Sequence, residues 1–316
     1  INVRSAAPEV GEGISGRIAA SFENDNGEYF EGYVGGSMSD TVAWRLALMD
    51  RSIDGYLDNV APSAVYPDSP TTDETIARIG LQWEPSAETS VGFRFTYADY
   101  QRIGSNSVIT QFAPTLVDST GDGVRNQPFV PSSNQLMYGI MGTLYPSYGG
   151  ANPNPNLGSR DVFYDGMSIG ASALGDPERV SGTDTENTEV SLNIQHEFGN
   201  GMTLSMITGV SEYEFEDGIE ADFLPVDFIG RSDDQEFEQF FQEVRLSSNL
   251  DGRFNWVVGA NYLKSTQEIE RGVMSDGTFG APAVVQAITG APSIWAYSPG
   301  QLSAIEAGFG LPPAVG

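Results

Sequence analysis

The feature that most constrains the fold is an alternation of apolar and polar residues that returns in segment after segment. In 254–262, Phe254, Trp256, Val258, Ala260 and Tyr262 occupy every second position, so all five side chains would point to one side of a β-sheet. The same alternation marks the segments 16–22, 28–34, 42–51, 75–83, 91–98, 189–196, 203–213 and 239–247. We therefore predict about nine strands and an all-β fold.

The connections between these strands alternate in length. The run 24–27 is Asn-Asp-Asn-Gly, a strong hairpin signal. From there on, short turns near 37–41, 84–89, 198–202 and 249–253 alternate with long connections at 52–72, 101–185, 214–235 and 265–316. In an up-and-down sheet every second connection lies at the same end, so all the long ones would emerge on one side. Transmembrane barrels of outer membranes have this asymmetry, with short periplasmic turns and longer extracellular loops.

The two faces of the predicted strands differ in charge. Six of the 15 basic residues fall on the face opposite the apolar stripe: Arg17, Arg45, Arg51, Arg78, Arg94 and Arg245. In a soluble sandwich the apolar face would be the core, whereas in a barrel it meets lipid and the charged face lines the bore. Trp44, Trp83 and Tyr97 lie near strand ends on the apolar face, which favours an aromatic girdle. We predict an antiparallel up-and-down transmembrane β-barrel that is partial, with about nine strands of a larger barrel.

Composition narrows the function further. The chain has 316 residues and a formal net charge of -28, from 15 Lys and Arg against 43 Asp and Glu. Nucleic acid is therefore not an expected partner, because its phosphates would be repelled. Cysteine is absent, which excludes disulfides, thiolate metal sites and a cysteine nucleophile. No run of about 18 apolar residues occurs, which excludes a transmembrane helix.

Catalysis finds little support in the sequence. His196 is the only histidine, and its place on the apolar face near a strand end favours packing over a role as base or ligand. Without His or Cys partners, a serine nucleophile would lack its usual base. The run 118–123 resembles a calcium loop, but Phe129 replaces the acidic twelfth ligand, which favours a simple turn. We expect no enzyme, no metal and no cofactor.

Ligand contacts are expected at the end that carries the long connections. Arg51 and Arg102 lie near that end and could meet anionic groups of a small-molecule ligand. Aromatic residues of the long connections could contact the ligand at the outer mouth: Tyr138, Tyr145, Tyr148, Phe223 and Phe228. The alternative is that the bore charges pair with each other or with another domain, and that these aromatics pack the loops together. The acidic residues of 212–222 are interpreted as part of a solvated loop.

Several segments resemble the TonB-dependent outer-membrane receptors. INVRSAAP at the start is similar to the motif where the plug domain of that family ends and the chain enters the barrel. GGSMSDTVAWRLALMD followed by DGY resembles early barrel strands, and MTLSMITGVSEYE, FQEVRLSSN and FNWVVGANYL resemble strands from mid-barrel. The resemblance covers most of the strand regions and little of the loops.

The resemblance implies uptake of a scarce ligand such as a ferric siderophore, cobalamin or an oligosaccharide across the bacterial outer membrane. It also implies outer-membrane lipid, a plug domain and, through the plug, TonB as partners. Neither plug nor TonB box is visible, and such barrels have about 22 strands. We therefore expect the N-terminal part of a barrel, with residues 1–15 as the entry segment and 101–185 and 265–316 as long extracellular loops. A soluble secreted glycan-binding β-protein and a passive porin remain the alternatives.

Overall fold

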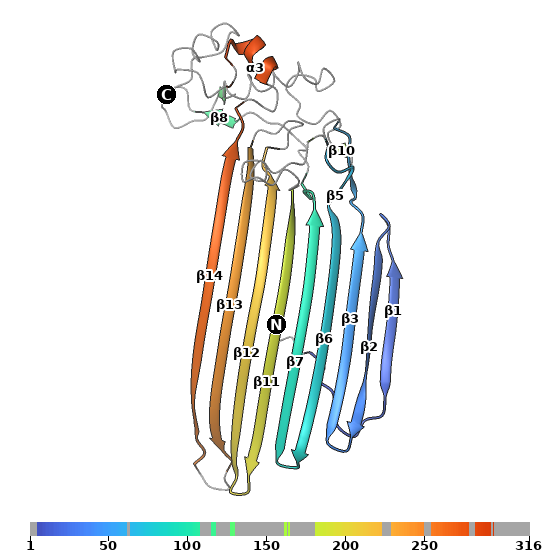
Figure 1. The fold of residues 1–316 in the computed structure, drawn as a ribbon, viewed down its shortest axis with the longest axis vertical. Coiled ribbons are helices and arrows are strands. Elements are labelled where there is room, and N and C mark those ends of the chain that lie inside the picture. The colour runs from blue at the N-terminus through green and yellow to red at the C-terminus, as the bar shows by residue number, and fades with distance from the viewer. Residues whose placement is uncertain are drawn as a thin grey trace.

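A computed structural model of the chain describes residues 5–61, 64–107, 115–117, 127–129, 161–162, 164, 181–222, 229–249, 254–277, 282–291 and 293. Nine long strands form one antiparallel meander in which each strand pairs with the next along the sheet (Figure 1). They are β1 (Ser15–Phe22), β2 (Glu28–Ser39), β3 (Val42–Ile53), β6 (Thr71–Ser86), β7 (Thr89–Ile103), β11 (Gly182–Phe198), β12 (Met202–Glu220), β13 (Ile229–Ser248) and β14 (Val257–Ser275). The predicted antiparallel meander is confirmed.

Short elements gather at one end of this sheet. β4 (Leu57–Asn59), β5 (Asp68–Ser69) and β10 (Asp161–Val162) form a small sheet, and β8 (Thr115–Val117) pairs with β9 (Gln127–Phe129). A helix, α3, spans Pro282–Thr289. Figure 1 shows these elements at the top, where the β1–β2 hairpin also lies, and the other tight turns between the long strands at the bottom. The long connections therefore share one end, which we call the outer end, as the alternation of loop lengths predicts.

The turns have the backbone that their residues favour. In the hairpin between β1 and β2, Asp25 and Asn26 have φ angles of 57° and 51°, the left-handed conformation that Asp and Asn tolerate best. The connection between β11 and β12 is Gly199–Gly201, and Gly201 has a φ of 75°. These hairpins fix the register of the strands on either side.

Register aligns the apolar residues in continuous rows across the sheet. Leu46 of β3 lies opposite Val34 and Ile79, and the row continues through Phe95, Val190, Val210 and Phe240. Leu46 and Ile79 are each 43% exposed, so no described element covers them. A soluble sandwich would bury this face under a second sheet. An uncovered apolar face of this extent is the kind of surface that meets lipid.

The strands continue past the apolar rows at the outer end. The prediction of a loop over 214–235 is wrong, because β12 runs to Glu220 and β13 begins at Ile229. β14 likewise continues to Ser275, beyond the expected end at Lys264. Here the outward positions are acidic instead of apolar: Glu186, Glu214, Glu236 and Glu268 lie side by side in one row. The alternation that predicts a strand ends where the apolar rows end. The backbones of β11 to β14 nevertheless stay paired beyond that point.

β1 and β14 occupy the two edges of the main sheet and are not paired with each other in the described part of the chain. The small core of described buried residues lies at the outer end instead of under the sheet. It contains Leu57, Tyr66, Val162 and Tyr164, with Ile103 packed against it. None of the described helices is long and apolar enough to cross a membrane.

Candidate functional site

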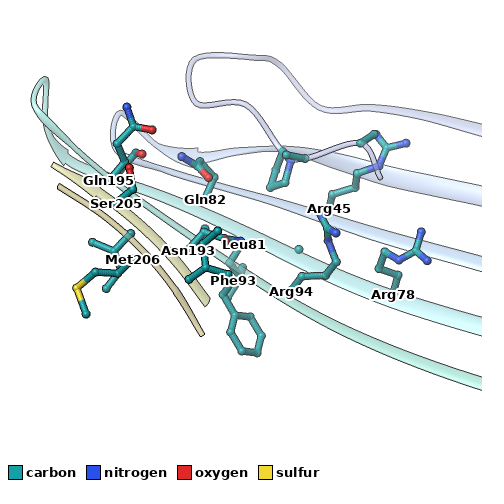
Figure 2. Close-up of a pocket in the computed structure, with 18 of the residues that line it drawn as sticks. Arg45, Arg78, Leu81, Gln82, Phe93, Arg94, Asn193, Gln195, Ser205 and Met206 are labelled. Carbon is teal, nitrogen blue, oxygen red and sulfur yellow. The ribbon is translucent and has the colours of Figure 1, made fainter. Parts of the chain in front are cut away.

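The face opposite the apolar rows, here called the polar face, is concave. One hollow of about 370 Å³ is lined by residues of β3, β6, β7, β11, β12 and β13, which is possible only if the sheet curves around it. Figure 2 shows Arg45, Gln82 and Gln195 on this side of the sheet, while Phe93 and Met206 extend from the other side. The polar face is therefore the side on which a ligand or a second domain would be enclosed.

Four arginines line the hollow near the short turns: Arg45, Arg78, Arg94 and Arg245. The guanidinium of Arg45 lies 3.6 Å from the centre of the Tyr33 ring, a cation–π contact. Arg78 Nε donates to Thr96 Oγ1 over 3.2 Å, and Arg245 lies 3.9 Å from Glu243. Because arginine presents its donors in a rigid fork, this basic hollow suits carboxylates or phosphates. We call it the arginine hollow.

The N-terminal segment crosses the arginine hollow before β1 begins. Ala6, Ala7 and Pro8 are part of its lining, so the chain passes over the sheet at this point. The backbone N–H of Ser37 donates to the carbonyl of Glu12 over 3.0 Å, which fixes the end of the segment against β2. Residues 5–14 therefore lie on the polar face as an ordered strap.

Arg51 and Arg102, predicted as ligand contacts, both lie on the polar face near the outer end. Arg51 stands opposite Tyr29 and Glu74, whereas Arg102 stands opposite Thr72 and Thr183. The two arginines are two strands and one row apart, which places their Cα atoms roughly 12 Å from each other. The structure places both arginines at the mouth, without direct contact between them.

Arg102 is one member of a polar network that continues across β11, β12 and β13. Its Nη2 donates to Thr183 Oγ1 over 3.2 Å, and Thr183 Oγ1 donates to Asp217 Oδ1 over 2.7 Å. Arg231 lies 3.7 Å from Asp217 and 2.9 Å from Asp233. Charge-assisted bonds of this kind hold a carboxylate in one orientation.

Arg271 of β14 closes this network by pairing with Asp233. The Asp233 side chain is only 3% exposed, so its two arginine partners offset the cost of burying its charge. We call Arg102, Thr183, Asp217, Arg231, Asp233 and Arg271 the mouth network. Sequence reasoning identified Arg102 alone. The alternation of Tyr213 and Phe215 with acidic residues indicates that the strand continues. The outward positions of this part of β12 are acidic, so the apolar stripe that marks the other strands is missing there.

Between the mouth network and the arginine hollow, the polar face of β12–β14 is aromatic and amide-rich. Tyr213 lies opposite Phe237, and their rings stack with centroids 5.3 Å apart and planes inclined by 28°. The Tyr213 hydroxyl donates to Gln235 Oε1 over 3.4 Å, and Gln267 Nε2 donates to the same oxygen over 3.5 Å. Both rings are half-buried. We call Tyr213, Phe237, Gln235 and Gln267 the aromatic–amide surface.

The buried core at the outer end holds part of the long connections in place. Tyr164 Oη and Ser69 Oγ are 2.8 Å apart, and Asn59 Nδ2 donates to the Tyr164 carbonyl over 2.9 Å. The rings of Tyr66 and Tyr164 meet edge to face at 6.2 Å. Burial raises the pKa of Tyr66 far above its ordinary value, and burial also raises the pKa of Tyr164. Folding therefore favours the protonated form of both phenols.

The remaining predicted residues are placed as follows. Tyr138, Tyr145, Tyr148, Phe223 and Phe228 lie outside the described residues, as do the turn 118–123 and most of the connection 101–185. His196 packs edge to face on Phe198 at 4.6 Å and shares a 2.8 Å hydrogen bond with Thr89. Within the described part of the chain, no group of three or more His, Asp or Glu side chains could hold a metal ion.

Comparison with solved structures identifies the fold. The ferric yersiniabactin uptake receptor FyuA from Yersinia pestis aligns with a TM-score of 0.53 over 84% of this chain and 33% of its own, at 12% identity. The fold is that of an outer-membrane receptor barrel. The ferric-catecholate import receptor Fiu from K12 E. coli aligns with a TM-score of 0.53 over 83% of this chain and 33% of its own, at 11% identity.

The ferripyoverdine receptor of the outer membrane of Pseudomonas aeruginosa aligns with a TM-score of 0.50 at 15% identity, over 85% of this chain and 29% of its own. The chain thus spans about a third of the length of these receptors. No protein-family model and no curated protein sequence matches the chain. The resemblance to TonB-dependent receptors inferred from the strand motifs is confirmed at the level of the fold.

Proposed function

We propose that this chain forms part of the wall of an outer-membrane receptor that takes up a scarce organic ligand with energy delivered through TonB. The observation on which the proposal rests is the contrast between the two faces of one meander sheet. One face has continuous apolar rows that no described element covers, and the other is concave and charged. A wall between lipid and a polar bore needs this contrast.

The proposal includes partners on each face. Outer-membrane lipid would contact the apolar rows, and a plug domain would occupy the bore against the arginine hollow. Arg51, Arg102 and the rest of the mouth network would lie where a ligand enters, and the aromatic residues of the long connections would add contacts there. Transport is proposed in preference to catalysis, because the described polar face has arginines, amides and paired carboxylates without a nucleophile–base pair.

The absence of cysteine permits a direct test of the membrane orientation. Leu81 and Gln82 are neighbours on β6, and Leu81 is 40% exposed on the apolar face. A fluorophore on Leu81→Cys should be quenched by nitroxide-labelled lipid and protected from iodide. The same fluorophore on Gln82→Cys should show the opposite result. Equal quenching of both positions by iodide would contradict a lipid-facing apolar surface and favour the soluble glycan-binding alternative.

Energy coupling needs a separate test in cells. Bacteria that carry the full receptor would be offered ferric siderophores, cobalamin or oligosaccharides as the required nutrient, with and without functional TonB. Growth on one nutrient that requires both the receptor and TonB would support the proposal. Growth that requires the receptor and continues without TonB would favour the passive-porin alternative.

A further inference from the structure

The aromatic–amide surface lies on the polar face, closer to the outer end than the apolar rows that would contact lipid. Glu212 and Glu214 flank Tyr213 along β12 and point to the opposite face, where carboxylates have replaced the apolar rows. Glu212 lies opposite Glu238, which flanks Phe237 in the same way. Carboxylates in rows do not face the hydrocarbon core of a membrane. The stacked rings therefore lie outside the hydrocarbon layer, at the exterior end of the barrel, and face the bore.

At this position the stacked rings contact neither lipid nor the arginine hollow. They do not contact lipid, because they are on the polar face. They also lie outside the arginine hollow, whose lining from β12 is Ser205, Met206 and Ile207. The row directly above them contains Phe215 and Gln235, and the mouth network follows one row further. A ligand that passes the mouth network would meet the ring faces next.

The chemistry of the surface selects a class of ligand. A stacked pair of rings presents an apolar π-face, which complements the C–H face of a saccharide ring. Glutamine amides both donate and accept hydrogen bonds, as sugar hydroxyls do. Gln235 uses its oxygen for Tyr213 and Gln267, and within the described part of the chain its amide nitrogen makes no hydrogen bond. That nitrogen can therefore donate to a ligand hydroxyl.

The neighbouring charges select against an anionic iron chelate at this position. Arg231 and Arg271, the nearest cations on the polar face of β13 and β14, are paired with Asp233. A ligand with several negative charges would have to compete with that buried carboxylate. The aromatic–amide surface itself has no charged side chain. From this combination we propose that Tyr213, Phe237, Gln235 and Gln267 form a binding subsite for an uncharged saccharide ring in the receptor bore.

The subsite deepens the proposed function and depends on it, because it names the substrate class of the same bore. The test uses the full receptor in nanodiscs and a panel of neutral malto-, cello- and xylo-oligosaccharides as probes, with binding measured by calorimetry. Phe237→Ala removes one ring of the stack and should weaken saccharide binding about five- to tenfold, since such stacks contribute about 1 kcal/mol. Glu238→Gln, next in sequence but on the outward face, is the matched control and should leave binding unchanged.

Tyr213→Phe provides a second readout that retains both rings. It removes only the hydroxyl that holds Gln235 and should weaken binding less than Phe237→Ala does, and it remains informative if Phe237→Ala fails to fold. The proposal is overturned if no saccharide of the panel binds, or if a saccharide binds and neither variant weakens it. If the subsite proposal fails in this way but cells grow on ferric siderophores with a requirement for TonB, the proposed receptor function is still supported. Iodide quenching at Leu81→Cys would instead remove the proposed function itself.

Discussion

Pro8 lies directly on Gly80: a β-carbon added to Gly80 would be 3.3 Å from Cδ of Pro8. That distance is shorter than an ordinary contact between two carbon atoms, so any larger side chain at this position would push Pro8 and the strap away from the sheet. Gly80 has Arg45 and Arg94 as its cross-strand neighbours. The strap therefore packs closely on the sheet at the centre of the arginine hollow, where Gly80 has no side chain.

Replacing Gly80 with leucine should lift the strap from the sheet. The larger side chain would occupy the space of Pro8, and residues 5–14 would become accessible to protease while β6 keeps its pairing. Gly209→Leu is the matched control, because Gly209 lies on the same face and a β-carbon there would meet only Phe241 Cβ at 3.9 Å. Mass spectrometry after limited proteolysis measures the change. Equal protection of the strap in both variants would contradict a close fit at Gly80.

The sequence predicts a strand of this fold only where the outward face of that strand has apolar residues at every second position. Between Val42 and Leu48 every second residue is a large apolar one, and the residues between them are alanine or arginine, so the sequence predicts the strand there. Between Glu214 and Glu220 the outward face is acidic and apolar residues occur on the other face, so the pattern of the belt is lost although the strand continues. Pairing there depends on backbone hydrogen bonds to β11 and β13, and a single sequence does not reveal them.

The same limit applies to the candidate site. Arg102 was predicted because it follows a clear strand, but its partners Thr183 and Asp217 come from segments interpreted as loops. Long-range pairing decides which polar residues meet, since Thr183 and Arg102 are 81 positions apart in the sequence. Charge and chemistry of single residues were therefore predictable, and their grouping into the mouth network was not.

The mouth network should lose stability when its central carboxylate is neutralised. Asp233→Asn keeps the size of the side chain but removes the charge that pairs with Arg231 and Arg271. Because the two arginine side chains are 37% and 54% exposed, solvent screens part of the loss, and we expect about 1–2 kcal/mol. Urea unfolding in nanodiscs measures it. Glu243→Gln removes a carboxylate near Arg245 on the same face and should reduce the free energy of unfolding by less. Equal reductions in the two variants would contradict a special role for Asp233.

The outward acidic row should respond in the opposite direction. Glu236 lies directly between Glu214 and Glu268, and like charges directly opposite each other on neighbouring strands repel. Glu236→Gln should therefore stabilise the barrel by about 0.2–1 kcal/mol. Added salt should reduce this gain, because it screens exposed charges. If the substitution destabilises the protein at every salt concentration, repulsion is not the dominant interaction in this row.

The buried core at the outer end should open in alkali before the sheet does. Burial raises the folded-state pKa of Tyr66 above its ordinary value of 10.0, so folding favours the protonated phenol. A raised pKa contributes stability that is complete below the unfolded value, about 10, and is lost as pH rises toward the folded value. Chymotrypsin cleavage within residues 54–70 should therefore increase above about pH 10, while the strands stay protected.

Tyr66→Phe tests whether this phenol is the group responsible. Phenylalanine keeps the ring that packs on Tyr164 at 6.2 Å and cannot ionise, so the pH at which cleavage begins should move upward. Tyr56→Phe is the control, because Tyr56 is 43% exposed, and it should leave the onset of cleavage unchanged. An onset that stays the same in Tyr66→Phe would show that alkaline opening begins at another group. Tyr164, whose pKa burial also raises, would then be the next residue to replace.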